Sequence, residues 1–142
     1  MKIRLLMLGK TRRAETVALL DDYVKRIGRA CPIELSEVRD ADAALKRLDA
    51  DRAATQVLLD AGGKTYDSDG FAKWLGAQRD RGAREMIFVC GDADGFSEKL
   101  RERVQQKMSL SAMTYSHELA RVMLAEQIYR AFAILSGSPY PK

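Results

Sequence analysis

Several residue types are scarce in this chain of 142 residues. It has only two cysteines, Cys31 and Cys90, which show neither the spacing of a zinc site nor a CxxC redox motif. We therefore expect both thiols to be reduced and packed. With a single histidine in addition, the sequence offers no set of residues from which we predict a metal site.

Long hydrophobic runs are also missing. No stretch is apolar for the length that a membrane span needs, and the opening residues are not followed by a cleavable signal pattern. The chain has no internal repeat, linker or low-complexity tract, and its hydrophobic content of 46% is ordinary for a globular protein. We expect a cytoplasmic protein that makes no membrane contact and folds as one domain over residues 1–142.

Positive charge is unevenly distributed along the sequence. The net charge is only +4, but the first thirty residues contain eight lysines and arginines against three acidic residues. This part of the chain either faces phosphate groups or is a solvated helix face and loop. A positive patch alone carries no sequence information, so both interpretations stay open.

Strand and helix patterns alternate along the chain. Short apolar runs at residues 2–8, 33–38, 57–59 and 86–90 predict strands, and helical spacing appears at residues 17–28, 40–52 and 68–75. Pro32 indicates that the second strand lies toward an edge, and the wholly apolar strand at 86–90 indicates a central position. Ser68 is a suitable cap for the third helix. The order predicts an open, mostly parallel α/β sheet flanked by helices.

In such sheets, ligands bind beyond the carboxyl ends of the strands. The rule points to Leu59 with the glycines that follow it, to residues 91–95, and to a loop at residues 109–116. Residues 91–95 lack the Lys-Ser/Thr pair of a P-loop and the third glycine of a dinucleotide fingerprint. They also fail as a calcium loop, because the twelfth position would be Arg103. We interpret them as a glycine turn that lets backbone approach a ligand.

The most specific pattern lies in the last third of the chain. Residues 109–116 are small, hydroxyl-bearing or apolar, which suits a tight loop, and a helical pattern follows. The helix has two apolar stripes: Leu124, Ala125, Ile128, Ala131, Phe132 and Leu135 form the first, and Leu119, Met123 and Ala133 surround Glu126 and Arg130 on the second. A second subunit is the simplest cover for the second stripe. Glu126 and Arg130 form either a helix-stabilising pair or part of a functional site.

These residues resemble the SPOUT superfamily of methyltransferases. The likeness is carried by residues 110–115, followed by His117, Arg121, Glu126, Tyr129-Arg130 and Pro139-Tyr140. Within the superfamily, the chain is similar to the small single-domain type that methylates N3 of a pseudouridine in bacterial 23S ribosomal RNA. The resemblance implies a C-terminal trefoil knot, a rare exception to the rule that folds avoid knots. It also implies S-adenosyl-L-methionine as cofactor, a homodimer, and the assembled ribosome as substrate.

The resemblance further implies particular site residues. The cofactor would be held by backbone groups and apolar side chains of Leu59, Gly91, Leu110, Ser111, Ala112, Met113, Thr114 and Tyr115. The catalytic candidates are Arg130, Tyr140 and Arg121, where Arg130, or less strongly Arg121, would stabilise the anion that develops on the base. RNA contacts are expected from His117, Lys142, Lys10 and Arg12. No residue is a convincing general base, and solvent is expected to take the proton.

Some alternatives stay open. A lone histidine more often has a structural role than a catalytic one, and end segments such as residues 140–142 often fray. Asp92-Ala93 stands where the family commonly has Gly-Pro or Gly-Ser, and Pro141 stands where it usually has histidine. The rival functions are another SPOUT methyltransferase, acting on ribose or transfer RNA, and a ribosome-binding protein without catalysis.

Overall fold

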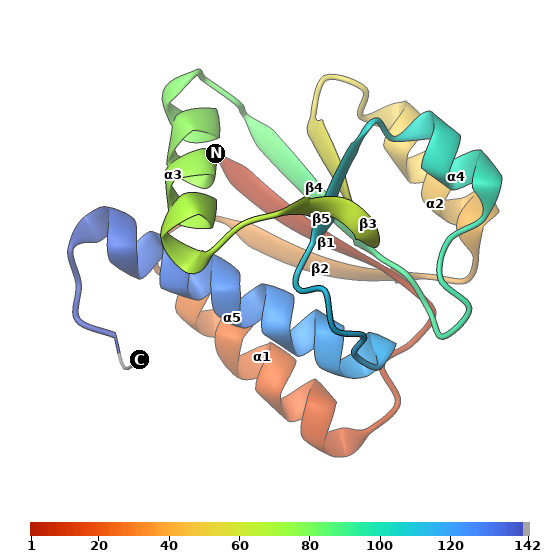
Figure 1. Ribbon diagram of the computed structural model, residues 1–142, viewed down its shortest axis with the longest axis horizontal. Helices are drawn as coiled ribbons and strands as arrows, with labels where there is room; N and C mark the ends of the chain where they lie inside the picture. Colours follow the sequence, from red (N-terminus) through yellow and green to blue (C-terminus); the bar gives the residue numbers. More distant parts are fainter. Residues whose placement is uncertain (141–142) are drawn as a thin grey trace.

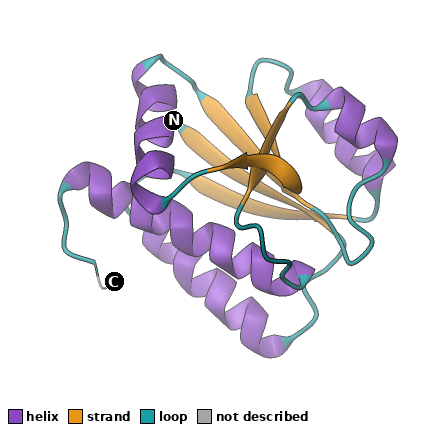
Figure 2. Ribbon diagram, in the orientation of Figure 1, coloured by secondary structure: helices purple, strands orange, loops and turns teal. Residues whose placement is uncertain are grey.

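The computed structural model describes residues 1–140, which form a sheet with helices on both faces (Figures 1 and 2). The candidate Lys142 and the unusual Pro141 lie outside the described residues. Among residues 1–140, no helix has the length and apolar character that a membrane span requires. The elements in chain order are β1 (Lys2–Leu8), α1 (Ala14–Gly28), β2 (Ile33–Val38), α2 (Ala41–Ala50), β3 (Thr55–Thr65), α3 (Ser68–Asp80), β4 (Glu85–Cys90), α4 (Glu98–Arg103), β5 (Gln106–Ser109) and α5 (His117–Ser136).

The sheet has the strand order β2-β1-β4-β3-β5, and every neighbouring pair is parallel. The predicted positions of two strands are confirmed, since β2 is an edge and β4 is central. Residues 86–90 of β4 are all buried, as expected for a strand covered on both faces. The prediction of an open parallel α/β sheet is therefore confirmed.

Two hydrophobic cores lie on opposite faces of the sheet. Helices α1, α3 and α5 cover one face, where Ile3, Leu5 and Phe88 point toward Leu124 and Ile128 of α5. Helices α2 and α4 cover the other face, which carries the alternate strand residues (Figure 1). The first apolar stripe predicted on α5 is thus confirmed as a core face.

The structure differs from the sequence-based expectations in a few local features. Helix α4 and strand β5 were not predicted, because six and four residues are too short to display a periodic pattern. Asp67, and not Ser68, caps α3, since its carboxylate accepts a hydrogen bond from the Gly70 N–H at 2.7 Å. Val17, placed on the apolar face of α1, is 38% exposed.

Strand β3 is much longer than predicted, and its second half crosses β5. The two strands pair from Val57 to Leu59, and again where Lys64 lies opposite Met108, with an irregularity between these segments. Figure 1 shows the second half of β3 arching across β5. At the crossing, a Cβ atom on Gly63 would lie 2.5 Å from the backbone of Lys107 and Met108. Only glycine allows the two backbones to pass this closely.

Candidate functional site

A cavity of about 460 Å³ opens at the carboxyl ends of β4 and β5, beside the middle of β3 at residues 59–61. The three segments that the strand-end rule singled out contribute to it, so their predicted convergence is confirmed. The glycines after Leu59 are the exception, because β3 continues to Thr65 and neither Gly62 nor Gly63 lines the cavity. Among the predicted cofactor residues, the lining includes Leu59, Gly91, Leu110, Ser111, Met113, Thr114 and Tyr115. Ala112 is exposed and does not line the cavity. The volume suits a small organic ligand of cofactor size.

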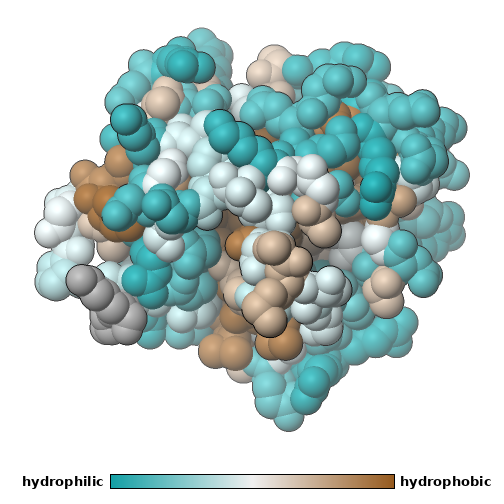
Figure 3. Space-filling model, in the orientation of Figure 1, coloured by the Kyte–Doolittle hydropathy of each residue, from teal (hydrophilic) through white to brown (hydrophobic). Residues whose placement is uncertain are grey.

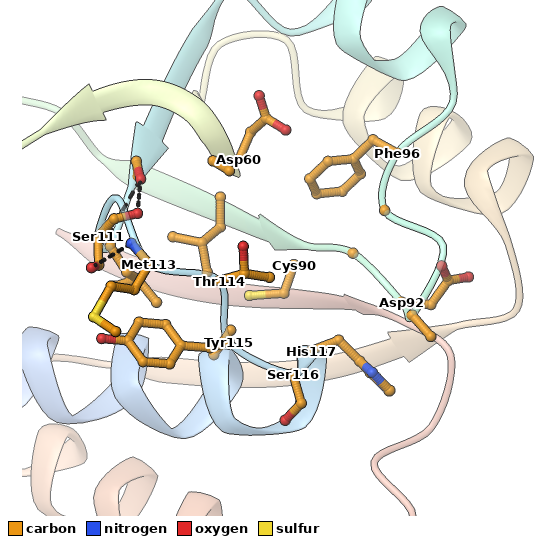
Figure 4. A pocket seen from close by; sticks show the side chains of 18 of the residues that line it. Asp60, Cys90, Asp92, Phe96, Ser111, Met113, Thr114, Tyr115, Ser116 and His117 are labelled. Atoms are coloured by element: carbon orange, nitrogen blue, oxygen red, sulfur yellow. Dashed lines mark hydrogen bonds between the residues drawn. The ribbon is translucent and has the colours of Figure 1, made fainter.

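The loop at residues 110–116 forms one wall of the cavity. Its serines satisfy its own backbone: the Ser109 hydroxyl donates to the Ser111 carbonyl at 2.9 Å, and the Met113 N–H donates to the Ser111 hydroxyl at 3.0 Å. Ser116 then caps α5 by accepting from the Leu119 N–H. Figure 4 shows Ser111 and residues 113–117 along one side of the cavity, with Asp60 and Phe96 on the other.

The opposite wall includes the glycine turn after β4. A Cβ atom on Gly91 would lie 3.2 Å from the Gly95 carbonyl oxygen, so the backbone at the end of the turn lies close to the backbone at its start. Asp92, which stands where the resemblance led us to expect glycine, fits this turn because its carboxylate accepts a hydrogen bond from the Asp94 N–H at 2.9 Å. Gly95 has a φ of 79°, which favours glycine. The departure at Asp92 therefore leaves a closed turn beside the cavity.

Cys90 lines the cavity floor and is only 1% exposed. Burial raises the pKa of its thiol to about 12, although the neighbouring Arg121 opposes the shift. The group is therefore protonated and unreactive at neutral pH, in agreement with the predicted packed thiol. Both cysteines are free.

We expect iodoacetamide at pH 8 to leave Cys90 unmodified in the folded protein. Cys31, which is partly exposed, should be alkylated first, although burial raises its pKa too. Mass spectrometry of the digested protein measures both sites, and labelling in urea, where both thiols react, is the control. Alkylation of Cys90 at the same rate in folded and unfolded protein would contradict the burial described above.

An ion pair on the cavity wall was missed by the sequence analysis. Arg101 of α4 lies 3.2 Å from the carboxylate of Asp60, whose side chain is only 11% exposed. The Nε of Arg101 is buried and has no hydrogen-bond partner among residues 1–140. Asp60 directly follows Leu59, so the strand-end rule pointed close to it. No pattern in the sequence indicated Arg101, because the short helix that carries it was not predicted.

Arg121 does not occupy the place expected for a residue near the reacting base. Its side chain is completely buried, and its guanidinium donates to the carbonyl groups of Leu8 at 2.6 Å and Gly9 at 3.0 Å. It also donates to the Thr11 hydroxyl at 2.8 Å and approaches the Gly91 carbonyl at 3.5 Å. The reason is that α5 begins beside the ends of β1 and β4, whose last carbonyl groups need donors. Arg121 therefore ties backbone segments together and does not face the cavity.

Tyr140, beyond the end of α5, packs back on Arg130 of α5, and neither residue lines the cavity. Arg130 lies 2.8 Å from the Glu126 carboxylate, Tyr140 donates to the same carboxylate at 2.9 Å, and the guanidinium stands 4.7 Å from the centre of the Tyr140 ring. The pair of Glu126 and Arg130 considered from the sequence is thus formed. Glu126 raises the pKa of Arg130, while burial and the hydroxyl of Tyr23 raise the pKa of Tyr140. Tyr140 is therefore neutral at physiological pH and is poorly suited to act as a base.

The described RNA-binding candidates lie at one edge of the cavity. His117 begins α5 and lines the cavity. Lys10 and Arg12 are exposed in the loop between β1 and α1. The Arg12 N–H donates to Glu118, the residue next to His117, at 2.8 Å. The structure thus brings these three residues into one region.

Comparisons with known proteins agree with the fold and the site. A family model described as predicted SPOUT methyltransferase matches residues 1–141. The ribosomal RNA large subunit methyltransferase H of Pelobacter propionicus is 42% identical over 151 residues, which cover 99% of both chains. That of Koribacter versatilis is 39% identical and covers 99% of this chain and 97% of its own.

Solved structures show the same fold at low sequence identity. A probable methylase family protein from Haemophilus influenzae superposes with a TM-score of 0.64 at 13% identity, over 99% of this chain and 72% of its own. The SpoU methyltransferase AviRb from Streptomyces viridochromogenes, solved with the cofactor AdoMet, gives a TM-score of 0.55 at 13% identity, over 98% and 59% of the respective chains. The chain belongs to the SPOUT methyltransferase family and has its knotted α/β fold.

Proposed function

We propose that this protein transfers the methyl group of S-adenosyl-L-methionine to N3 of a pseudouridine in the 23S ribosomal RNA of the assembled ribosome. The observation that carries the proposal is the cavity formed by the loop at residues 110–116, the turn at Gly91 and the middle of β3 at residues 59–61. The name of the relatives that match over nearly the whole chain, ribosomal RNA large subunit methyltransferase H, supports the ribosomal substrate. The same name disfavours the alternative function, which is methylation of transfer RNA.

The cavity offers a suitable environment for each part of the cofactor. Backbone groups of residues 110–115 and of Gly91 would contact the adenosine, with Leu59 supplying apolar surface. Asp60 and Arg101 would face the ammonium and carboxylate of the methionine part, because their charges are complementary to that zwitterion. The sulfonium of the bound cofactor makes the methyl group electrophilic, so the protein's task is to align the base with it.

The proposed enzyme is a homodimer. Met113 is 73% exposed and Leu119 is 54% exposed, and α1 adds the exposed Val17 and Leu19. Figure 3 shows apolar residues gathered on the face that carries α5 and α1. An exposed apolar patch of this kind favours a protein partner, and a second copy would cover Leu119 of the second stripe predicted on α5, whose Ala133 is already buried within the monomer.

A dimer would also explain why two of the predicted catalytic residues lie away from the cavity. Arg130 and Tyr140 do not line the cavity of their own copy. We propose that they act at the cavity of the partner, where the guanidinium stabilises the negative charge that develops on the base oxygens. Tyr140 would hold Glu126 and Arg130 in position through the contacts described above.

The test is methyl transfer from labelled S-adenosyl-L-methionine to ribosomes that lack the modification, followed by nucleoside mass spectrometry. We expect 3-methylpseudouridine as the product. The Arg130→Gln variant should lower kcat by about a hundredfold or more, because it removes a charge that stabilises the transition state. Arg52→Gln, which breaks the exposed pair of Arg52 with Asp49 on the opposite side of the sheet, is the matched control. Methylation of ribose or of transfer RNA would refute the proposed substrate.

Shared sites are tested by mixing inactive variants. In a mixed dimer, the cavity blocked by Gly91→Trp is also the one that would receive the altered residue of the Arg130→Gln copy. The other cavity has Gly91 and would receive an intact Arg130, so one of the two sites would remain intact. Co-expression should therefore restore roughly a quarter of the activity in a random mixture of dimers. If sedimentation analysis shows no dimer and mixing the variants restores no activity, the proposal that the two copies share their sites is wrong.

A further inference from the structure

The start of α5 binds the loop between β1 and α1 through a buried carboxylate. Glu118 is 7% exposed and accepts hydrogen bonds from the N–H groups of Arg12 at 2.8 Å and Arg13 at 3.2 Å. These N–H groups, together with the Thr16 hydroxyl, hold the pKa of Glu118 below its ordinary value against the effect of burial. Glu118 is therefore ionised at neutral pH and fixes the backbone that leads into α1.

The other half of the same loop is held by Arg121. Its guanidinium binds Leu8, Gly9 and Thr11, as described above, so α5 contacts the loop from its first residue to its last. Glu37 of β2 adds a hydrogen bond from the Thr11 N–H at 2.7 Å. A loop held at so many backbone positions has little freedom to move. We call Glu118 and Arg121 the loop clamp.

The clamped loop presents positive charge to solvent. The side chains of Lys10, Arg12 and Arg13 are exposed, and none has a carboxylate partner within 4 Å among residues 1–140. Only backbone groups of Arg12 and Arg13 are used by the clamp. The guanidinium and ammonium groups therefore remain available to an anion.

The loop also lies at the edge of the cavity. Glu118 follows His117, which lines the cavity, and Arg121 reaches toward the carbonyl of Gly91 on the opposite wall. A phosphate chain bound by Lys10, Arg12 and Arg13 would thus pass beside the cavity mouth. Arg121 therefore contacts both the loop and this wall of the site.

We infer that residues 10–13 form a preorganised phosphate-binding edge for the RNA substrate, and that Glu118 and Arg121 are positioning residues which hold this edge beside the cavity. The inference rests on the proposed function for the identity of the RNA. Positively charged side chains on a fixed loop bind phosphates without reading sequence, and they set the position of the strand. Arg13, Glu118 and the clamp itself are additions to the residues predicted from the sequence.

The charge of the edge is tested by binding to purified ribosomes, measured by sedimentation at several salt concentrations. The double variant Lys10→Gln/Arg12→Gln should bind more weakly and should reduce the slope of log K against log salt by about 2. Lys46→Gln/Arg47→Gln removes the same charge from the exposed face of α2 and should bind as the unaltered protein does. Equal weakening by both double variants would overturn the inference, because it would show a general effect of net charge.

The positioning role is tested by a double-mutant cycle with Glu118→Gln. This variant keeps the size of the side chain but is neutral. Its amide has only one oxygen, so it can no longer offer a carboxylate oxygen to each of the Arg12 and Arg13 N–H groups. It should raise the KM for ribosomes severalfold, with kcat and the affinity for S-adenosylhomocysteine nearly unchanged. In the Lys10→Gln/Arg12→Gln background, the same substitution should have little further effect, because the edge it positions is already disabled.

The outcomes separate the inference from the proposed function. An equal effect of Glu118→Gln in both backgrounds would mean that Glu118 acts only through stability, and the positioning role would be wrong. If the unaltered protein binds ribosomes but methylates none, the proposed reaction fails. The phosphate-binding edge would then still be judged by the sedimentation experiment alone.

Discussion

The Gly91→Trp variant is expected to lose measurable binding of S-adenosyl-L-methionine. Gly91 lines the cavity, and even a Cβ atom at this position would lie 3.2 Å from the Gly95 carbonyl oxygen. An indole has no room on the side of the turn and must occupy the cavity of about 460 Å³. We expect at least about a hundredfold weaker binding, which corresponds to about 2.8 kcal/mol.

Isothermal titration calorimetry measures this effect directly. Lys46→Trp, on the exposed face of α2, adds the same side chain away from the cavity and should bind the cofactor normally. The cofactor should also raise the Tm of the unaltered protein and of the control, but not that of Gly91→Trp. If Gly91→Trp folds and binds as tightly as the control, the cavity is not the cofactor site.

The second large effect is expected at the crossing of β3 and β5. In Gly63→Ala, the new methyl group would lie 2.5 Å from the carbonyl carbon of Lys107 and from the nitrogen of Met108. These atoms belong to the backbone of β5, which is held in place by its pairing with β3. The clash therefore cannot be relieved by moving a flexible side chain. We expect the free energy of unfolding to fall by at least about 3 kcal/mol, at the upper end of the range for overpacking.

The neighbouring glycine provides a matched control. A Cβ atom on Gly62 would meet only the Asp60 carboxylate, at an ordinary distance of 3.4 Å. Gly62→Ala should therefore change the free energy of unfolding by less than about 1 kcal/mol. Urea denaturation of both variants measures the difference. Similar stabilities would show that the two backbones do not pass as closely at Gly63 as described.

The sheet and the cavity walls were predictable because their signals are local. The apolar strand at residues 86–90 showed its central position directly, and Pro32 indicated the edge strand. The strand-end rule then brought Leu59, Gly91 and residues 110–115 to one place, where the cavity lies. Hydrophobic patterning and the ends of parallel strands thus predicted both the fold class and the location of the site.

The parts that were not predictable depend on contacts between distant segments. Glu118 and Arg121 appear in the sequence as ordinary helix residues, and their burial depends on the ends of β1 and β4, about a hundred residues earlier for β1. The sequence suggested a role for Arg121 at the reacting base, whereas the structure gives it a role between backbone segments. Gly63 likewise reads as one more glycine in a turn. Its importance comes only from the strand that passes next to it.

The arrangement of α5 has a consequence for synthesis on the ribosome. The carbonyl groups at the end of β1 are among the first to be made, yet the guanidinium that satisfies them belongs to Arg121. Until residues 106–121 have been translated, the nascent chain has neither the cavity wall formed by residues 110–116 nor a fixed basic loop. Cofactor capture and RNA binding therefore become possible together and late, so an unfinished chain should be unable to compete with the finished enzyme for either ligand.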